Sequence, residues 1–273
     1  MRGHLARRAG FAEVWQYRPM AYQPVTRLFV EASLGEGGSL GLAAAQAHYL
    51  KSVLRLDKGD EVALFNGRDG EYGARIAGMG RGWCSLDVLA QRRPQRNEAD
   101  LWLVFAPIKR ARLDFLVEKA TELGVSEIRP VMTARTMVAR VNAERLKANA
   151  IEAAEQSERL SVPDVFEPVK LAELLKTWPA GRKLILCDES GTAKPIAEAL
   201  KVQGLNGSSP APCAILTGPE GGFADSELDD LRKLPFVCAV GLGPRVLRAD
   251  TAALASLAAF QALAGDWTRD RPR

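Results

Sequence analysis

Two glycine-bearing loops near the C-terminal end constrain the fold of this chain more than any other stretch. The first lies in A-I-L-T-G-P-E-G-G-F (214–223), where a short apolar run leads through glycines to a helix that begins near Asp225. The second lies in 240–254, where Asp250 or Thr251 is placed to cap an alanine-rich helix. Each loop joins a strand to a helix, which is typical of an α/β protein.

Glycines at the ends of strands predict a ligand site. A residue without Cβ lets the backbone approach a ligand, and open α/β sheets bind ligands at the carboxyl ends of their strands. The phosphate-binding patterns fit neither loop: 218–223 lacks the Gly-Lys-Ser/Thr ending of a P-loop, and Val246 stands where a dinucleotide fingerprint has a third small residue. Either loop alone is better interpreted as a ligand-free turn. Together, with Glu220, Arg245 and Arg248, they favour one shared pocket.

The two motifs resemble the signature loops of the RsmE family, bacterial 16S rRNA uridine-N3 methyltransferases of the SPOUT (α/β-knot) superfamily. T-G-P-E-G-G-F and L-G-P-R-V-L-R-A-D-T-A-A-L carry the resemblance, which extends from Arg27 to about Trp267. Asp250 stands where the family usually has Glu. The resemblance implies an α/β fold with a C-terminal SPOUT knot, a parallel sheet with a trefoil knot, preceded by a small PUA-like β-barrel domain.

The resemblance also implies S-adenosyl-L-methionine as cofactor, without a metal. Leu186 to Glu189 is expected to close one wall of the pocket. The residues that it assigns to cofactor binding are Leu216, Gly218, Pro219, Glu220, Gly221, Gly222, Leu242, Gly243, Leu247 and Thr251.

Three residues of the loops are the catalytic candidates: Arg248, Arg245 and Glu220. Uridine N3 carries a proton at neutral pH, so the site must remove it or stabilise the resulting anion. The two arginines are expected to stabilise negative charge on the uracil, as an oxyanion hole does, and Glu220 or Asp250 to take the proton. The alternative is an ion pair of Arg248 with either carboxylate that only braces the loops.

Charge and composition exclude several classes of protein. The chain has 273 residues and a formal net charge of +4, but the ends 1–26 and 268–273 carry this excess and the remainder is close to neutral. Local basic patches must therefore support any RNA argument. The four cysteines lack C-x-x-C spacing and only two histidines exist, which argues against a disulfide framework and a His-rich metal site. No stretch is apolar for long enough to span a bilayer, and we expect a cytoplasmic protein.

Short strand-like runs predict a β-rich domain over 27–90. The turn Asn66 to Gly70 is a hairpin signal, and Ala43 to Leu56 has helical periodicity. The resemblance makes this domain a PUA-like RNA-binding module, although His48 is better interpreted as an ordinary helix histidine. Residues 1–26 lack sustained periodicity and are expected to be a disordered or mis-started extension, with an organellar transit peptide as a weaker alternative.

Beyond a polar linker at 91–100, strands and helices alternate over 101–267. This alternation predicts a parallel sheet covered on both faces, whereas the trefoil knot comes from the resemblance alone. The expected helices are Leu113–Leu123, Ala143–Leu160, Leu171–Thr177, Pro195–Val202 and Thr251–Ala264. The last has apolar residues around most of its circumference, which favours a homodimer.

Basic residues predict the RNA contacts. Lys109, Arg110 and Arg112 follow a strand and so lie at its ligand-facing end, and the resemblance adds Arg27 and Arg55. In the linker, Arg92, Arg93 and Arg96 are equally well interpreted as RNA contacts or as solvated side chains. The segment E-Q-S-E-R (155–159) matches a further element of the family, although its helical setting alone suggests only a polar face.

The expected partner is 16S rRNA within the small ribosomal subunit. Two alternatives stay open: a related SPOUT methyltransferase acting on another rRNA or tRNA base, and a non-catalytic RNA-binding dimer.

Overall fold

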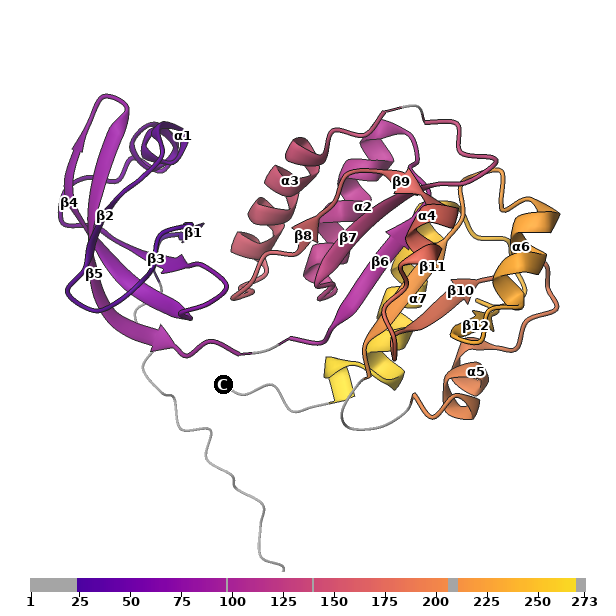
Figure 1. Ribbon diagram of the computed structural model, residues 1–273. Coiled ribbons are helices and arrows are strands. Elements are labelled where there is room, and N and C mark those ends of the chain that lie inside the picture. The colour runs from indigo at the N-terminus through magenta and orange to yellow at the C-terminus, as the bar shows by residue number, and fades with distance from the viewer. Residues whose placement is uncertain (1–23, 97, 139, 206–210, 269–273) are drawn as a thin grey trace, which may run out of the picture.

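The computed structural model describes residues 24–96, 98–138, 140–205 and 211–268, and it contains two sheets joined by one connecting segment (Figure 1). The N-terminal sheet has five strands in the order β1-β3-β4-β5-β2. The C-terminal sheet has seven, in the order β12-β10-β11-β6-β7-β8, with β9 paired to β7. The expectation of a disordered extension at 1–26 falls mostly outside the described residues.

The N-terminal domain is a β-rich module with one short helical segment. Its elements are β1 (Arg27–Phe29), β2 (Ser39–Gly41), α1 (Ala44–His48), the π-helical turn η1 (Tyr49–Val53), β3 (Glu61–Phe65), β4 (Glu71–Gly80) and β5 (Trp83–Arg93). The predicted hairpin is confirmed, because β3 and β4 pair antiparallel across it. Alternate strand residues such as Leu28, Leu64 and Leu86 are almost fully buried and form its core.

The C-terminal domain confirms the predicted α/β alternation. Its elements are β6 (Leu101–Phe105), α2 (Arg110–Glu122), β7 (Glu127–Met132), α3 (Ala143–Gln156), β8 (Asp164–Val165), β9 (Val169–Lys170), α4 (Leu171–Lys176), β10 (Lys183–Cys187), α5 (Ile196–Val202), β11 (Cys213–Thr217), α6 (Asp225–Arg232), β12 (Val237–Val240), α7 (Ala249–Leu263) and η2 (Asp266–Thr268).

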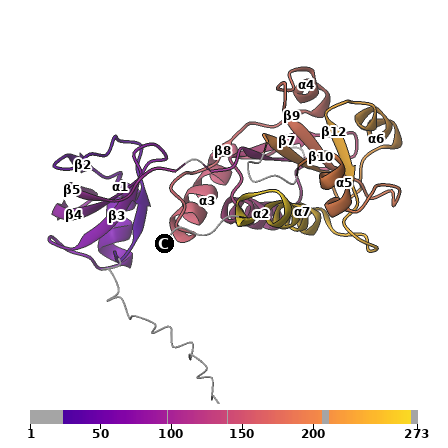
Figure 2. The ribbon, with the colours of Figure 1, turned by 90° about the horizontal axis from the view of Figure 1, so that it is seen from below.

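Helices cover both faces of this sheet, as predicted. Every registered strand pair in it is parallel. Figure 2 shows α2 and α7 on one face and α4 and α6 on the other. Phe105, Leu113 and Phe260 belong to the core on the first face, and Leu216 and Leu228 to the core on the second. The trefoil knot stays a prediction.

Several predicted boundaries are wrong. Helix α2 begins at Arg110 rather than Leu113, and helix α3 ends at Gln156 rather than Leu160. Helix α7 begins at Ala249, with Arg248 as the N-cap residue and no side-chain cap, so neither Asp250 nor Thr251 caps it. Asp250 lies in the first turn, where its carboxylate accepts a hydrogen bond from the Thr251 N–H (3.0 Å) and complements the helix dipole. Strand β5 continues to Arg93, opposite Glu71, so the first three residues of the expected linker belong to the sheet.

Arg27 makes most of the hydrogen bonds that dock the N-terminal domain on the C-terminal end of α3. Arg27 donates from Nε to Glu71 (2.7 Å) and from its two Nη atoms to the carbonyls of Ala154 (3.0 Å), Glu155 (2.9 Å) and Arg159 (2.6 Å). These carbonyls are at or just beyond the helix end, where a cation is favoured. Strand β1 is thereby fixed against the C-terminal domain.

Two more arginines complete this junction. Arg93 donates to Glu71 (2.6 Å) and to the Glu158 carbonyl (3.0 Å). Arg159 is buried, pairs with Glu98 and donates to the Thr121 carbonyl (2.6 Å).

Within the described segments, no helix combines the length and apolarity that crossing a bilayer requires.

Candidate active site

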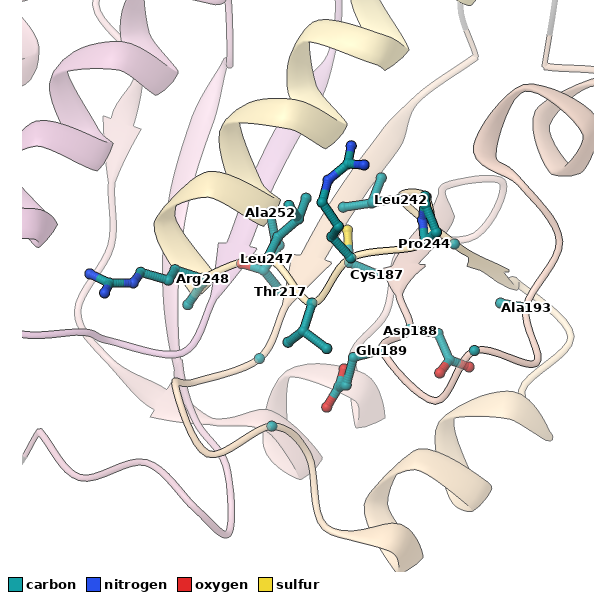
Figure 3. A pocket seen from close by; sticks show the side chains of 18 of the residues that line it. Cys187, Asp188, Glu189, Ala193, Thr217, Leu242, Pro244, Leu247, Arg248 and Ala252 are labelled. Carbon is teal, nitrogen blue, oxygen red and sulfur yellow. The ribbon is translucent and has the colours of Figure 1, made fainter.

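A cavity of about 660 Å³ lies at the carboxyl ends of three neighbouring strands, β10, β11 and β12 (Figure 3). The segment after each strand contributes to its lining: 187–195 after β10, 217–222 after β11 and 241–252 after β12. Because parallel strands end at the same edge of a sheet, segments separated by 50 residues meet here. The two glycine loops therefore share one pocket, as the sequence predicts.

Glycine is required at the centre of the first loop. Gly222 has φ +66°, a conformation that L side chains rarely adopt, and a Cβ there would collide with the Glu189 carboxylate. That carboxylate accepts a hydrogen bond from the Phe223 N–H (3.2 Å). A Cβ on Gly218 would lie 3.0 Å from the Phe223 ring. The loop is thus folded tightly against the end of β10.

The segment after β10 forms the third wall, of which the sequence predicts only the beginning. The Gly241 N–H donates to the Lys194 carbonyl (2.8 Å), which ties this segment to the second glycine loop. Asp188 accepts from Arg232 Nη2 (2.6 Å) and from the Ser190 N–H (2.9 Å). Burial alone would raise the pKa of Asp188, but these hydrogen bonds outweigh it and hold the pKa below its usual range. Asp188 therefore stays an anion that braces α6.

Most residues assigned to the cofactor line the cavity. These are Gly218, Pro219, Glu220, Gly222, Leu242, Gly243 and Leu247. Leu216, Gly221 and Thr251 do not line it, and their assignment to the cofactor stays a prediction. Leu216 is fully buried in the core, Gly221 packs against Arg135, and Thr251 is exposed on the first turn of α7.

Both arginines predicted to be catalytic, Arg245 and Arg248, lie on the lining and are exposed, as is Glu220. In the described part of the chain, no hydrogen bond or ion pair engages either guanidinium, so the bracing pair with Glu220 or Asp250 is not present. Figure 3 shows the Arg248 side chain extending away from Cys187 and Leu242. Two cations without protein counter-ions are left to act on a ligand.

Cys187 is the one sulfur group on the lining, and it is not a nucleophile at neutral pH. Burial raises the pKa of its thiol to about 12, although a hydrogen bond with Ser256 opposes the shift. The protonated thiol is unreactive because only the thiolate attacks.

Among the residues that the structure describes, no group of three or more His, Cys, Asp or Glu side chains is placed to hold a metal ion.

The residues assigned to RNA divide into two groups. Lys109 and Arg110 are exposed at the N-terminus of α2, and Arg112 is partly exposed in the same first turn. Arg55 is exposed and has φ +57°, unusual for a residue other than glycine. Arg27 is different, because its side chain is only 10% exposed and donates its hydrogen bonds to protein acceptors at the junction. It therefore holds the domains together and does not face the RNA.

Two family models match the chain. The model described as "RNA methyltransferase domain" matches residues 95–261, and the one described as "RNA methyltransferase PUA domain" matches residues 42–89. The first contains the whole C-terminal sheet and both glycine loops. The second falls within the five-stranded sheet, in agreement with the PUA-like domain expected from the sequence.

Several similar proteins share one name. Ribosomal RNA small subunit methyltransferase E of Rickettsia conorii is 33% identical over 238 residues, covering 87% of this chain and 95% of that protein. The protein of the same name from Bacillus subtilis is 26% identical over 86% of this chain and 95% of its own length. The crystal structure of the Neisseria gonorrhoeae protein bound to S-adenosyl methionine superposes with a TM-score of 0.78 at 28% identity, covering 90% of this chain and all of that one. The chain belongs to the ribosomal RNA small subunit methyltransferase E (RsmE) family of RNA methyltransferases.

Proposed function

We propose that this protein transfers the methyl group of S-adenosyl-L-methionine to N3 of a uridine in 16S rRNA. One observation carries the proposal: the cavity formed by the two glycine loops presents two arginines without counter-ions. The Neisseria relative, whose structure holds S-adenosyl methionine, and the shared name of the curated relatives support the cofactor and the rRNA substrate.

The cavity fits the cofactor in size and lining. Small-molecule sites typically enclose about 300–1,000 Å³ and combine apolar walls with a few polar groups. Leu242, Leu247 and Pro219 supply apolar walls, and Gly218 and Gly222 let backbone groups approach the ligand. When bound, S-adenosyl-L-methionine supplies a methyl group on a sulfonium that already carries its leaving group.

The residues of this chain then have two tasks. They hold the uracil with N3 in line with the methyl–sulfur bond, and they remove the N3 proton. Arg248 and Arg245 stabilise the negative charge that spreads over the uracil carbonyls as the proton leaves. Glu220, exposed on the lining, accepts that proton. Since Arg248 is exposed and extends away from Cys187 and Leu242, it acts on the acceptor base rather than on the cofactor.

The remaining assignments belong to the same proposal. Lys109, Arg110, Arg112 and Arg55 contact phosphates of 16S rRNA within the small subunit, and the N-terminal domain anchors the RNA. The protein acts in the cytoplasm as a homodimer. Exposed apolar side chains near α7 support the dimer: Val246 is 88% exposed and Leu263 is 38% exposed.

Mass mapping of 16S rRNA nucleosides tests the proposal. RNA from a deletion strain is compared with RNA from the same strain complemented with this chain, and we expect one N3-methyluridine to appear only on complementation. Methylation at another base would support the related-methyltransferase alternative, and no methylation would support a non-catalytic role. Calorimetry with S-adenosylhomocysteine in EDTA tests cofactor binding separately, and light scattering at micromolar concentration tests the dimer.

A further inference from the structure

A second cavity, of about 600 Å³, lies between the N-terminal ends of α2 and α3. Its lining includes the apolar side chains of Ile108, Leu113, Val138 and Val141 and the guanidinium groups of Arg110 and Arg140. Ile108 and Leu113 are almost fully buried, whereas Arg110 and Arg140 are exposed. The cavity therefore has an apolar floor and a charged rim.

The sheet order places this cavity directly beside the first one. The first cavity is built from the segments that follow β12, β10 and β11, and the second from those that follow β6 and β7. Strands β11 and β6 are neighbours in register, and the Ala106 N–H donates to the Thr217 carbonyl (3.0 Å) where both strands end. Both cavities thus occupy consecutive stretches of one sheet edge.

The segment after β7 connects the two cavities. Arg135 donates from Nη1 to the carbonyl of Gly221 (3.2 Å), in the loop of the first cavity. Val138, three residues later, lines the second cavity. Three extended residues span at most about 11 Å, so the cavities are within reach of a few nucleotides of one RNA strand.

The lining of the second cavity suits a nucleotide better than a bare anion. In the described residues, no hydrogen bond or ion pair engages the side chains of Arg110 and Arg140, whereas Arg145 on the same lining is held by Asp114 (2.6 Å). Glu144 and Glu167 also line the cavity, and two carboxylates would oppose a free phosphate.

A nucleotide uses all these groups together. An apolar floor accepts a base, arginines bind the phosphate, and carboxylates accept hydrogen bonds from a base amino group or a ribose hydroxyl. We propose that the second cavity is a subsite for a nucleotide of the RNA strand whose target base enters the first cavity. This inference rests on the proposed function, because it assumes that the first cavity receives an RNA base. Two occupied subsites on one rigid sheet edge fix the register of the strand, so the second cavity positions the target uridine.

Steady-state methylation with small ribosomal subunits from a deletion strain tests the subsite. We expect Arg140→Ala and Arg110→Ala each to raise the KM for subunits about tenfold, because a lost hydrogen bond to a charged group has an effect of that order. The KM for S-adenosyl-L-methionine should stay within about twofold of wild type. The slope of log KM against log salt should fall by about 0.7 to 0.9 for each phosphate contact removed. The matched control is Lys201→Ala, which removes one exposed charge from α5, outside both cavities.

A second variant separates a nucleotide subsite from a general charge effect. Val138→Trp fills the cavity without changing charge, so it should raise the KM for subunits and leave the salt slope unchanged. The subsite is overturned if all three cavity variants match Lys201→Ala, or if they change the light-scattering mass while the KM for subunits stays at the wild-type value, because the cavity would then be a subunit interface. Should wild-type protein methylate no subunits, the proposed function fails, and filter binding of 16S rRNA by the same variants decides the subsite by itself.

Discussion

Arginines in two regions of this molecule have opposite environments. At the domain junction, Arg159 is buried and Arg27 is largely buried, and carboxylates and backbone carbonyls accept their hydrogen bonds. At the first cavity, Arg245 and Arg248 are exposed and no described residue is paired with either. The number of protein acceptors around a guanidinium therefore separates the arginines that hold the domains together from those available to a ligand.

The difference has an energetic basis. Burial lowers the pKa of Arg27 from its usual value, although Glu71 opposes the shift, so the buried cation is tolerated only with its full set of acceptors. The cavity arginines stay solvated until a ligand arrives. In the proposed mechanism their charge interacts with negative charge that develops only during the reaction, and an interaction of this kind lowers the activation barrier.

The largest expected effect comes from Arg248→Ala. We expect turnover to fall on the order of 10²-fold or more, because loss of one charge-stabilising donor typically has this effect. Cofactor binding measured by calorimetry should remain largely intact, since the lost interaction belongs to the transition state. Arg248→Lys keeps the charge and should recover part of the rate. Wild-type turnover in Arg248→Ala would remove this residue from the mechanism and weaken the comparison.

Next in size is Arg27→Ala at the junction. Glu71 keeps Arg93 at 2.6 Å, but three carbonyls lose their donors, so we expect a loss of about 2 kcal/mol in unfolding free energy. The KM for small subunits should rise because the RNA module is no longer fixed against α3, while cofactor affinity stays the same. The matched control is Arg75→Ala, whose pair with Glu61 is exposed and should contribute almost nothing. Equal unfolding midpoints for the two variants would contradict a junction built on Arg27.

The sequence predicts the sheet and its helices well because the C-terminal strands are short, uniformly apolar runs. It does not separate the two kinds of arginine. The Arg27 acceptors lie 44 residues away at Glu71 and 127 residues away at Ala154, and no local pattern records such contacts. Whether an arginine is paired with protein acceptors can therefore be told only from the structure with the two domains docked.

The sequence predicts the parts of the site that depend on glycine backbone conformation. It does not predict which way the individual side chains of the site point. Gly222 has a positive φ, and the sequence G-P-E-G-G around it is typical of a turn that requires one. Leu216, near the end of β11, is buried in the core, whereas Gly221, in the loop that follows, packs against Arg135. The third wall, at 188–195, could have been predicted in full from the sequence, because D-E-S-G-T-A is a turn motif directly after a buried strand.

A smaller effect is expected from Gly222→Ala in the cavity. The substitution forces a side chain into a left-handed conformation and against Glu189, at a local cost of about 1–2 kcal/mol. We expect the calorimetric Kd for S-adenosylhomocysteine to rise roughly tenfold, as that cost implies. Gly221→Ala is the matched control, because its φ is not positive and its Cβ would lie 3.7 Å from Arg135 in ordinary contact. Equal affinities for the two variants would show that this loop does not shape the cofactor site.

The smallest effect, from Glu155→Gln, tests whether the junction depends on charge or on hydrogen-bond geometry. Glu155 accepts the Phe29 N–H (2.9 Å), and burial raises its pKa although that hydrogen bond and Arg27 oppose the shift. A raised pKa means that the contribution of this group to stability is complete below the unfolded-state value of about 4.3 and is lost as pH rises through the folded-state value. Glutamine keeps an acceptor and has no charge to bury. Urea unfolding should therefore find Glu155→Gln more stable than wild type at pH 7.5, by about 0.5 kcal/mol or less, with the difference vanishing near pH 4. Glu36→Gln, in an exposed turn, should show no such pH dependence. A less stable Glu155→Gln at pH 7.5 would mean that attraction between the Glu155 carboxylate and Arg27 holds the domains together, and that charge pairing outweighs geometry at this junction.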